Sequence, residues 1–244
     1  MSRGDEFFVG YAPRMPPGTG RTIRVTSLVL VGAALVVAAG LATVQRPPAP
    51  ARFEYGLVRP FDGVVLERPV PMLLVTGPGG STTGYLLVDE GKHGARLDNL
   101  HGRPARLEGT LIQRGRRTMV ELHGPADIAG PPAPVPQASP PDELVLAGEI
   151  VDAKCHLGAM NPGDGLTHRA CALRCLSGGI PALLVVPGSA GPEQIILAPE
   201  PGSALPRPVR DLAGLPVRAR GLVDSVAGWR VLRVSSATFS REGW

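Results

Sequence analysis

A cluster of thiol and imidazole side chains in the second half of the chain has the composition of a metal site. All three cysteines and two of the five histidines fall within residues 148–181. If residues 168–177 form a helix, His168, Cys171 and Cys175 lie on one face of it, because an α-helix turns by about 100° per residue. Thiolates and imidazoles are ligands that zinc takes up in tetrahedral sites.

The remaining cysteine, Cys155, follows an apolar strand predicted at 144–151. A loop rich in glycine and proline then returns the chain to the helix, which completes a Cys3His set. The predicted ligands are Cys155, His168, Cys171 and Cys175. His156 and Met160 are candidate auxiliary ligands, whereas Asp152 is expected to be solvated or to lie beside the ligands without a catalytic role. Zinc is the simplest occupant, and copper(I) is the next, because it favours soft ligands.

Local signals define the ends of the predicted helix. Thr167 is a candidate N-cap, since its hydroxyl can accept a hydrogen bond from the first turn. The glycine pair 178–179, followed by Pro181, predicts the C-terminal end.

Two other uses of the cysteines stay open. A disulfide within the helix is disfavoured, because residues four apart place their Cβ atoms about 5–6 Å apart and a disulfide needs about 3.8 Å. Cys155 bridged to one helix cysteine, with the other free, is the workable pairing. Thiol–disulfide exchange is the second alternative, because the helix start, Arg169 and Arg174 would lower the pKa of Cys171.

The composition favours strands and loops and gives no case for an enzyme. The chain has 244 residues, 43% of them hydrophobic, with 27 prolines and 32 glycines, which suits one or two small β-rich domains. The formal net charge is only +4 and aromatic residues make up 4%, so no nucleic-acid partner is predicted. Motifs for a nucleophile elbow, a phosphate-binding loop, a zinc protease or haem attachment do not occur.

An uncharged stretch near the N-terminus predicts a membrane anchor. Residues 25–44 carry no charge and are long enough to cross a bilayer. The leader 1–24 contains Arg3, Arg14, Arg21 and Arg24. This predicts a single-pass helix in the inner (cytoplasmic) membrane, a cytoplasmic N-terminus and a periplasmic remainder. A signal peptide cleaved near residues 40–42 is the rival interpretation.

Proline-rich segments divide the rest of the chain. A spacer at 45–52 precedes a first domain at 53–129, and a linker at 130–142 precedes a second domain at 143–240. Few contacts are expected to cross the linker. The predicted strands are 63–66, 72–75, 85–88, 105–112 and 118–122, then 144–151, 182–186, 194–198, 217–223 and 229–234. The predicted fold is mainly β: two tandem small OB-like β-barrel domains after one N-terminal transmembrane helix.

A short internal similarity links the two domains. Residues 97–111 match residues 209–223, with shared leucine, glycine and proline positions that indicate a turn and a strand bent at a glycine. The first domain contains no cysteine, and His93 in its polar loop is expected to be exposed or hydrogen-bonded. The first domain is therefore predicted to be structural or to bind a partner.

The cysteine pattern resembles one found in exported bacterial proteins of uncharacterised function. The pattern is G-x-x-x-D-x-x-C, a glycine-rich loop, and then H-x-x-C-x3-C. Its positions here are Gly148, Asp152, Cys155, His168, Cys171 and Cys175. The resemblance covers about thirty-five residues and implies a shared cysteine site in an OB-like domain.

Together, these features predict a membrane-anchored periplasmic metal-binding protein that is an accessory component of a membrane redox or metal-handling system. The alternatives are a non-catalytic assembly subunit with a structural disulfide and a periplasmic thiol-redox protein. The expected partners are the membrane and other membrane redox subunits, which the aromatic cluster at 7–11 would contact.

Overall fold

The chain forms two compact units, residues 1–48 and residues 49–244. The computed structural model describes residues 15–44, 50–97, 99–189, 191–201 and 203–242. The aromatic cluster at 7–11, most of the leader and most of the proline-rich spacer lie outside the described residues.

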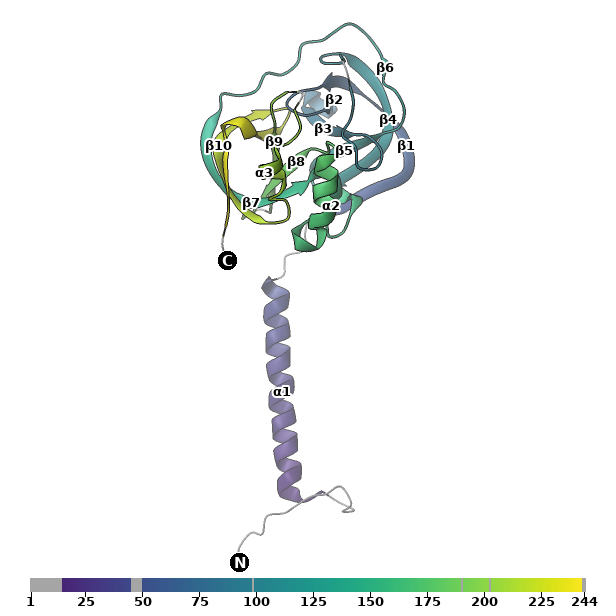
Figure 1. Cartoon of the computed structure of the whole chain (residues 1–244). Helices are drawn as coiled ribbons and strands as arrows, with labels where there is room; N and C mark the ends of the chain where they lie inside the picture. Colours follow the sequence, from purple (N-terminus) through teal and green to yellow (C-terminus); the bar gives the residue numbers. More distant parts are fainter. Residues whose placement is uncertain (1–14, 45–49, 98, 190, 202, 243–244) are drawn as a thin grey trace, which may run out of the picture. The chain divides into compact units, whose positions relative to one another are not determined.

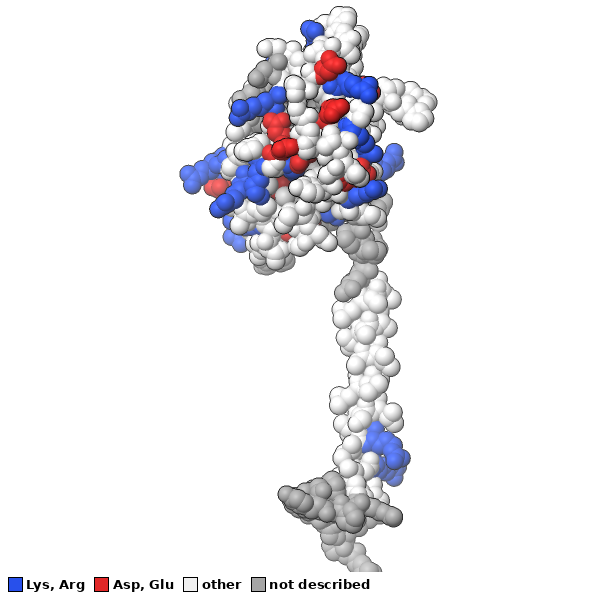
Figure 2. Space-filling view, turned by 90° about the vertical axis from the view of Figure 1, so that its right-hand side faces the viewer, with Lys and Arg blue, Asp and Glu red and all other residues white. Residues whose placement is uncertain are grey.

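The first unit contains one long apolar helix, α1 (Pro17–Val44). It starts eight residues before the predicted span, because Pro17 suits a first helical turn and nothing in the following turns breaks the helix. By length and composition α1 can cross a membrane, and a signal sequence passes the same test. Its charged side chains, Arg21 and Arg24, lie near its N-terminal end, and the rest of the helix is uncharged (Figure 2).

The first barrel of the second unit closes five strands in the order β1-β2-β3-β5-β4, with β4 paired back to β1. All of its pairings are antiparallel except β3–β5, which is parallel. A short strand, β6, extends the sheet beside β4. The strands are β1 (Ala51–Leu66), β2 (Met72–Thr76), β3 (Thr82–Val88), β4 (Pro104–Arg114), β5 (Arg117–Leu122) and β6 (Asp127–Ile128). A 3-10 turn, η1 (Pro78–Gly80), joins β2 to β3.

The second barrel repeats this strand order as β7-β8-β9-β11-β10, closed by the pairing of β10 with β7. Again one pairing, β9–β11, is parallel. The strands are β7 (Asp142–Asp152), β8 (Ala182–Val186), β9 (Glu193–Ala198), β10 (Pro216–Val226), β11 (Trp229–Arg233) and β12 (Thr238–Arg241). Two short helices, α3 (Arg207–Arg210) and η3 (Val234–Ser236), complete it. The predicted fold of two small OB-like barrels after one apolar helix is confirmed, and each of the ten predicted strands is present.

The two barrels share one hydrophobic core, so the expectation that few contacts cross the linker is wrong. The shared cluster includes Leu66, Met72, Leu86, Val151, Leu183 and Trp229. Trp229 of β11 donates a hydrogen bond from Nε1 to the carbonyl of Gly84 in β3 at 2.7 Å. The Arg117 guanidinium lies 4.1 Å from the centre of the Trp229 ring and also binds the Gly228 carbonyl. Each barrel has apolar side chains on part of its outer surface, and these two apolar surfaces pack against one another.

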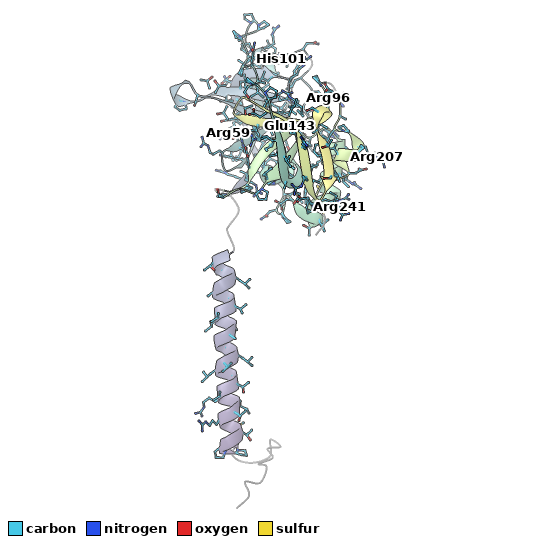
Figure 3. The ribbon with its side chains drawn as sticks, turned by 90° about the vertical axis from the view of Figure 1, so that its left-hand side faces the viewer. Arg59, Arg96, His101, Glu143, Arg207 and Arg241 are labelled. Carbon is cyan, nitrogen blue, oxygen red and sulfur yellow. The ribbon has the colours of Figure 1, made fainter. Side chains whose placement is uncertain are left out.

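Many charged side chains lie on the solvent-exposed surface of the barrels. Figure 3 labels Arg59, Glu143, Arg207 and Arg241, which project from the surface of the two barrels. Several of these residues pair with an opposite charge, as Arg59 does with Glu54 at 2.8 Å. The basic composition thus belongs to a mixed, solvated surface.

The connection between β7 and β8, residues 153–181, carries the three cysteines and is called the cysteine insert below. It contains a π-helical turn, η2 (Cys155–Ala159), and helix α2 (Gly165–Ser177), which is drawn in green in Figure 1. The helix starts before the predicted N-cap Thr167, because the carboxylate of Glu149 accepts a hydrogen bond from Gly165 N at 2.6 Å and satisfies a free amide of the first turn. Its C-terminal end at the glycine pair 178–179 is as predicted.

Candidate metal centre

Three thiols gather where the end of β7 meets α2. Cys155 lies three residues after the end of β7, and Cys171 and Cys175 lie one helical turn apart on α2. The Sγ atoms of Cys155 and Cys175 are 3.9 Å apart. Cys155 is 5% exposed and Cys175 1%, whereas Cys171 is half-buried. All three are free thiols, with Cys171 nearest to solvent.

The ligand atoms form two overlapping groups within the described part of the chain. Those of Cys155, His168 and Cys171 lie within 4.8 Å of one another, and so do those of Asp152, Cys155 and Cys175. Cys155 belongs to both groups. The four predicted ligands are therefore brought together at one place, although no single described group holds all four, so side-chain rotation is needed to close them around one ion.

A buried carboxylate supports the imidazole. Asp152 has no exposed surface, and its Oδ2 lies 3.0 Å from Nε2 of His168, which is also buried. Its Oδ1 accepts a hydrogen bond from the backbone amide of Cys155 at 2.9 Å. A carboxylate on one ring nitrogen orients a histidine so that the other nitrogen can bind a metal. Of the two expected positions of Asp152, in solvent or beside the ligands, the structure shows the second, since the last residue of β7 is buried against His168 and Cys155.

A lysine of the first barrel completes the surroundings of the thiols. Lys92 lies between β3 and β4, and its Nζ donates to Cys171 Sγ at 2.8 Å and to Cys175 Sγ at 3.5 Å. The hydrogen bond to Cys171 raises the pKa of Lys92, so the amine is a cation at neutral pH. The sequence predicted that the first domain contributes no residue to the site. It does contribute Lys92, which could not be anticipated because Lys92 and Cys171 are far apart in the sequence.

The loop that carries Lys92 is held from both sides. Lys154 of the second barrel is buried, forms an ion pair with Glu121, and donates to the carbonyls of Asp89 at 3.1 Å and Gly91 at 2.6 Å. On the other side, the backbone of the loop packs directly against the backbone at the end of α2, and no space is left for a side chain between them. Gly94 N donates to Gly178 O at 3.0 Å, and a Cβ at Gly178 would collide with Lys92 O.

The two closest thiols differ in acidity. The hydrogen bond from Cys155 lowers the pKa of Cys175 to about 7, while the same interaction and burial raise the pKa of Cys155. Cys175 is therefore the thiol of this pair that ionises first.

The two candidate auxiliary ligands lie apart from these groups. His156 is buried with its Nδ1 3.6 Å from the Asp164 carboxylate, and it belongs to neither group of ligand atoms. Burial lowers the pKa of His156 to about 4. Met160 is 47% exposed. The π-helical turn after Cys155 carries the next residues away from the thiols.

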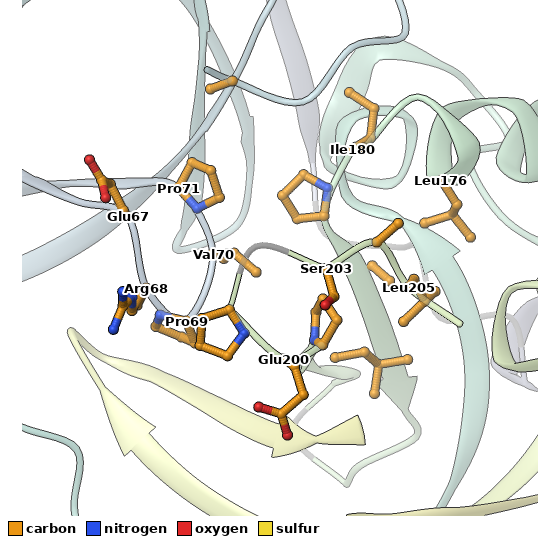
Figure 4. Close-up of a pocket in the computed structure, with 18 of the residues that line it drawn as sticks. Glu67, Arg68, Pro69, Val70, Pro71, Leu176, Ile180, Glu200, Ser203 and Leu205 are labelled. Carbon is orange, nitrogen blue, oxygen red and sulfur yellow. The ribbon is translucent and has the colours of Figure 1, made fainter. Parts of the chain in front are cut away.

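A cavity of about 500 Å³ lies between the barrels on another side of the insert (Figure 4). Leu176 and Ile180, at the end of α2, form part of its apolar wall together with Val70 and several prolines. The described lining contains no cysteine or histidine, so this cavity is separate from the thiol cluster.

Two contacts of the site were not anticipated from the sequence, Asp152 with the Cys155 amide and Lys92 with the thiols, and the first of them had a local signal. Asp152 stands three residues before Cys155, the spacing at which an aspartate accepts the amide of a starting helical turn. Lys92 had no such signal. Comparison with protein-family models, curated proteins and solved structures found no match.

Proposed function

We propose that this chain is a membrane-anchored protein that binds one metal ion through Cys155, His168, Cys171 and Cys175. The observation that carries the proposal is the pair of overlapping ligand groups that share Cys155, with a buried carboxylate behind the imidazole. Buried thiols and an oriented imidazole form a donor set typical of structural zinc sites.

Zinc is the first candidate ion, because three thiolates and one imidazole complete its tetrahedral shell without a water. Copper(I) is the second, since it also favours thiolates and accepts three ligands, the number in each of the two groups. No open coordination position is required by either ion, which favours a structural or metal-handling role over catalysis.

The proposed location follows from α1. A helix of this length with Arg21 and Arg24 at its N-terminal end supports an inner-membrane anchor with a cytoplasmic N-terminus and periplasmic barrels. We place the protein as a non-enzymatic accessory component of a membrane redox or metal-handling system, with membrane redox subunits as partners. A sizing experiment in mild detergent tests the partners, because a lone monomer in every detergent would contradict this part.

Metal analysis of protein purified from membranes under reducing conditions tests the metal site. We expect about one zinc or copper per chain, and a content below about 0.2 per chain would contradict the proposal, because structural sites bind tightly. His168→Ala should lower the metal content. His123→Ala is the matched control, because His123 lies in the first barrel with Thr110 and Glu90 as its partners.

The distance of 3.9 Å between Cys155 and Cys175 supports a second candidate, a thiol–disulfide redox pair. Closing this pair would release two protons and two electrons, which a partner disulfide would accept as it is reduced to two thiols. Oxidation with glutathione disulfide, followed by thiol counting, tests it. Formation of a bridge in Cys171→Ser but not in Cys175→Ser would favour this candidate over the metal site if the purified protein also lacks metal.

A further inference from the structure

We infer that Lys92 of the first barrel is part of the metal site: its ammonium group neutralises charge on the thiolate–metal centre and covers Cys171. This inference rests on the proposed metal site. It makes the site a joint product of both barrels rather than a property of the cysteine insert alone.

The charges around the thiols require a cation. Three thiolates and one divalent ion carry a net negative charge, and Asp152, buried behind His168, adds another. A buried net charge is costly unless an opposite charge with hydrogen-bonding contact accompanies it. Lys92 makes that contact with two of the thiols, at 2.8 Å to Cys171 and 3.5 Å to Cys175.

The other lysine near the site is already occupied. Lys154 precedes Cys155, but its amino group is paired with Glu121 and bonded to the carbonyls of Asp89 and Gly91. Its charge is therefore balanced within the first barrel. Among the described charged groups that hydrogen-bond to the three thiols, Lys92 is the cation.

The backbone of the loop that carries Lys92 is fixed by contacts other than the thiols. The Gly94 to Gly178 hydrogen bond and Lys154 hold it beside the end of α2, so the amine needs only side-chain rotation to reach the thiols. A donor held near its acceptor by a fixed backbone lowers the cost of reorganisation on binding. Lys92 also stands over Cys171, the half-buried thiol, where the site is nearest to solvent.

The test compares zinc affinity, measured by competition with a chelator, in full-length wild type, Lys92→Met and Lys92→Arg. Lys92→Met should bind zinc about 10-fold to 100-fold more weakly, as expected for loss of a hydrogen bond from a charged group. Lys92→Arg should recover most of the affinity. The metal-free Lys92→Met protein should unfold at the same denaturant concentration as metal-free wild type, because Lys92 is exposed. Arg116→Met, an exposed change in the first barrel, is the control.

Wild-type affinity in Lys92→Met would overturn the inference. So would weak binding in both Lys92 variants together with a less stable metal-free protein, since that pattern belongs to a purely structural lysine. If wild type itself takes up no zinc or copper(I), the proposed metal site fails instead, and the two failures are thereby distinguished.

Discussion

The carboxylate of Asp152 lies 3.0 Å from His168 Nε2 and has no contact with solvent. This pair joins the end of β7 to the N-terminal part of α2. The same carboxylate also accepts a hydrogen bond from the backbone amide of Cys155. One side chain therefore fixes two of the proposed ligands.

Replacing Asp152 with asparagine should weaken metal binding about 10-fold to 100-fold, the usual cost of losing a carboxylate behind a metal-binding histidine. The number of ions bound per chain should stay the same, since all four ligands remain. Chelator competition measures the affinity. Asp142→Asn, an exposed change at the other end of β7, should bind like wild type, and equal affinities for both variants would contradict the role of Asp152.

The helix cysteines should differ once metal is removed. Cys175 is 1% exposed within the shared core, so in chelator-treated protein Cys175→Ser should lower the free energy of unfolding by about 1–3 kcal/mol, the cost of burying a hydroxyl. Cys171→Ser at a half-buried position should change it by less than about 0.5 kcal/mol. Urea unfolding measures both. An equal loss of unfolding free energy in the two variants would contradict the prediction that the more buried thiol contributes more to stability.

The two barrels should unfold together. Trp229 binds Gly84 across the barrels, so Trp229→Phe should lower the free energy of unfolding by about 1–3 kcal/mol and leave one transition for residues 49–244. Hydrogen exchange of both barrels during denaturation is the measurement. Tyr55→Phe, at a side chain 83% exposed, is the control. Two separate transitions in wild type would contradict a single cooperative unit.

Acid should destabilise the protein through His156. Its pKa is about 4 in the folded chain against 6.5 in a model peptide, so the unfolded chain binds the proton first. Above about pH 6.5 the residue is neutral in both states and has no effect; stability is lost as the pH falls from about 6.5 to about 4, by roughly 3 kcal/mol at most. In metal-free protein, His156→Gln should flatten this part of the stability profile. An unchanged slope would exclude His156 as its source.

The strands could be predicted from sequence because their signals are local. Short runs rich in apolar and β-branched residues, bounded by glycine or proline, mark β2, β5 and β8 with small errors in their ends. The convergence of the helix ligands was likewise a matter of helical spacing. The start of α2 was missed because its first amide is satisfied by Glu149, a residue of β7 rather than a neighbour in the helix.

The environment of the thiols depended on packing. Lys92 and Cys171 are 79 residues apart, and only the docking of the two barrels brings them into contact. His156 shows the reverse case, because it is adjacent to a predicted ligand in sequence yet the π-helical turn directs it toward Asp164. Neighbouring residues in the sequence therefore predicted the strands well, but they did not predict which side chains surround the thiols.

The close backbone contact between Gly94 and Gly178 limits how this protein can evolve. Either position could accept a side chain only if the opposite segment changed its course, because neither leaves space for a Cβ. A side chain at either glycine would therefore require a matching change in the segment of the other barrel. The two barrels are therefore not interchangeable modules. A second barrel moved into another protein would expose the backbone around Gly178 that the first barrel's loop covers here.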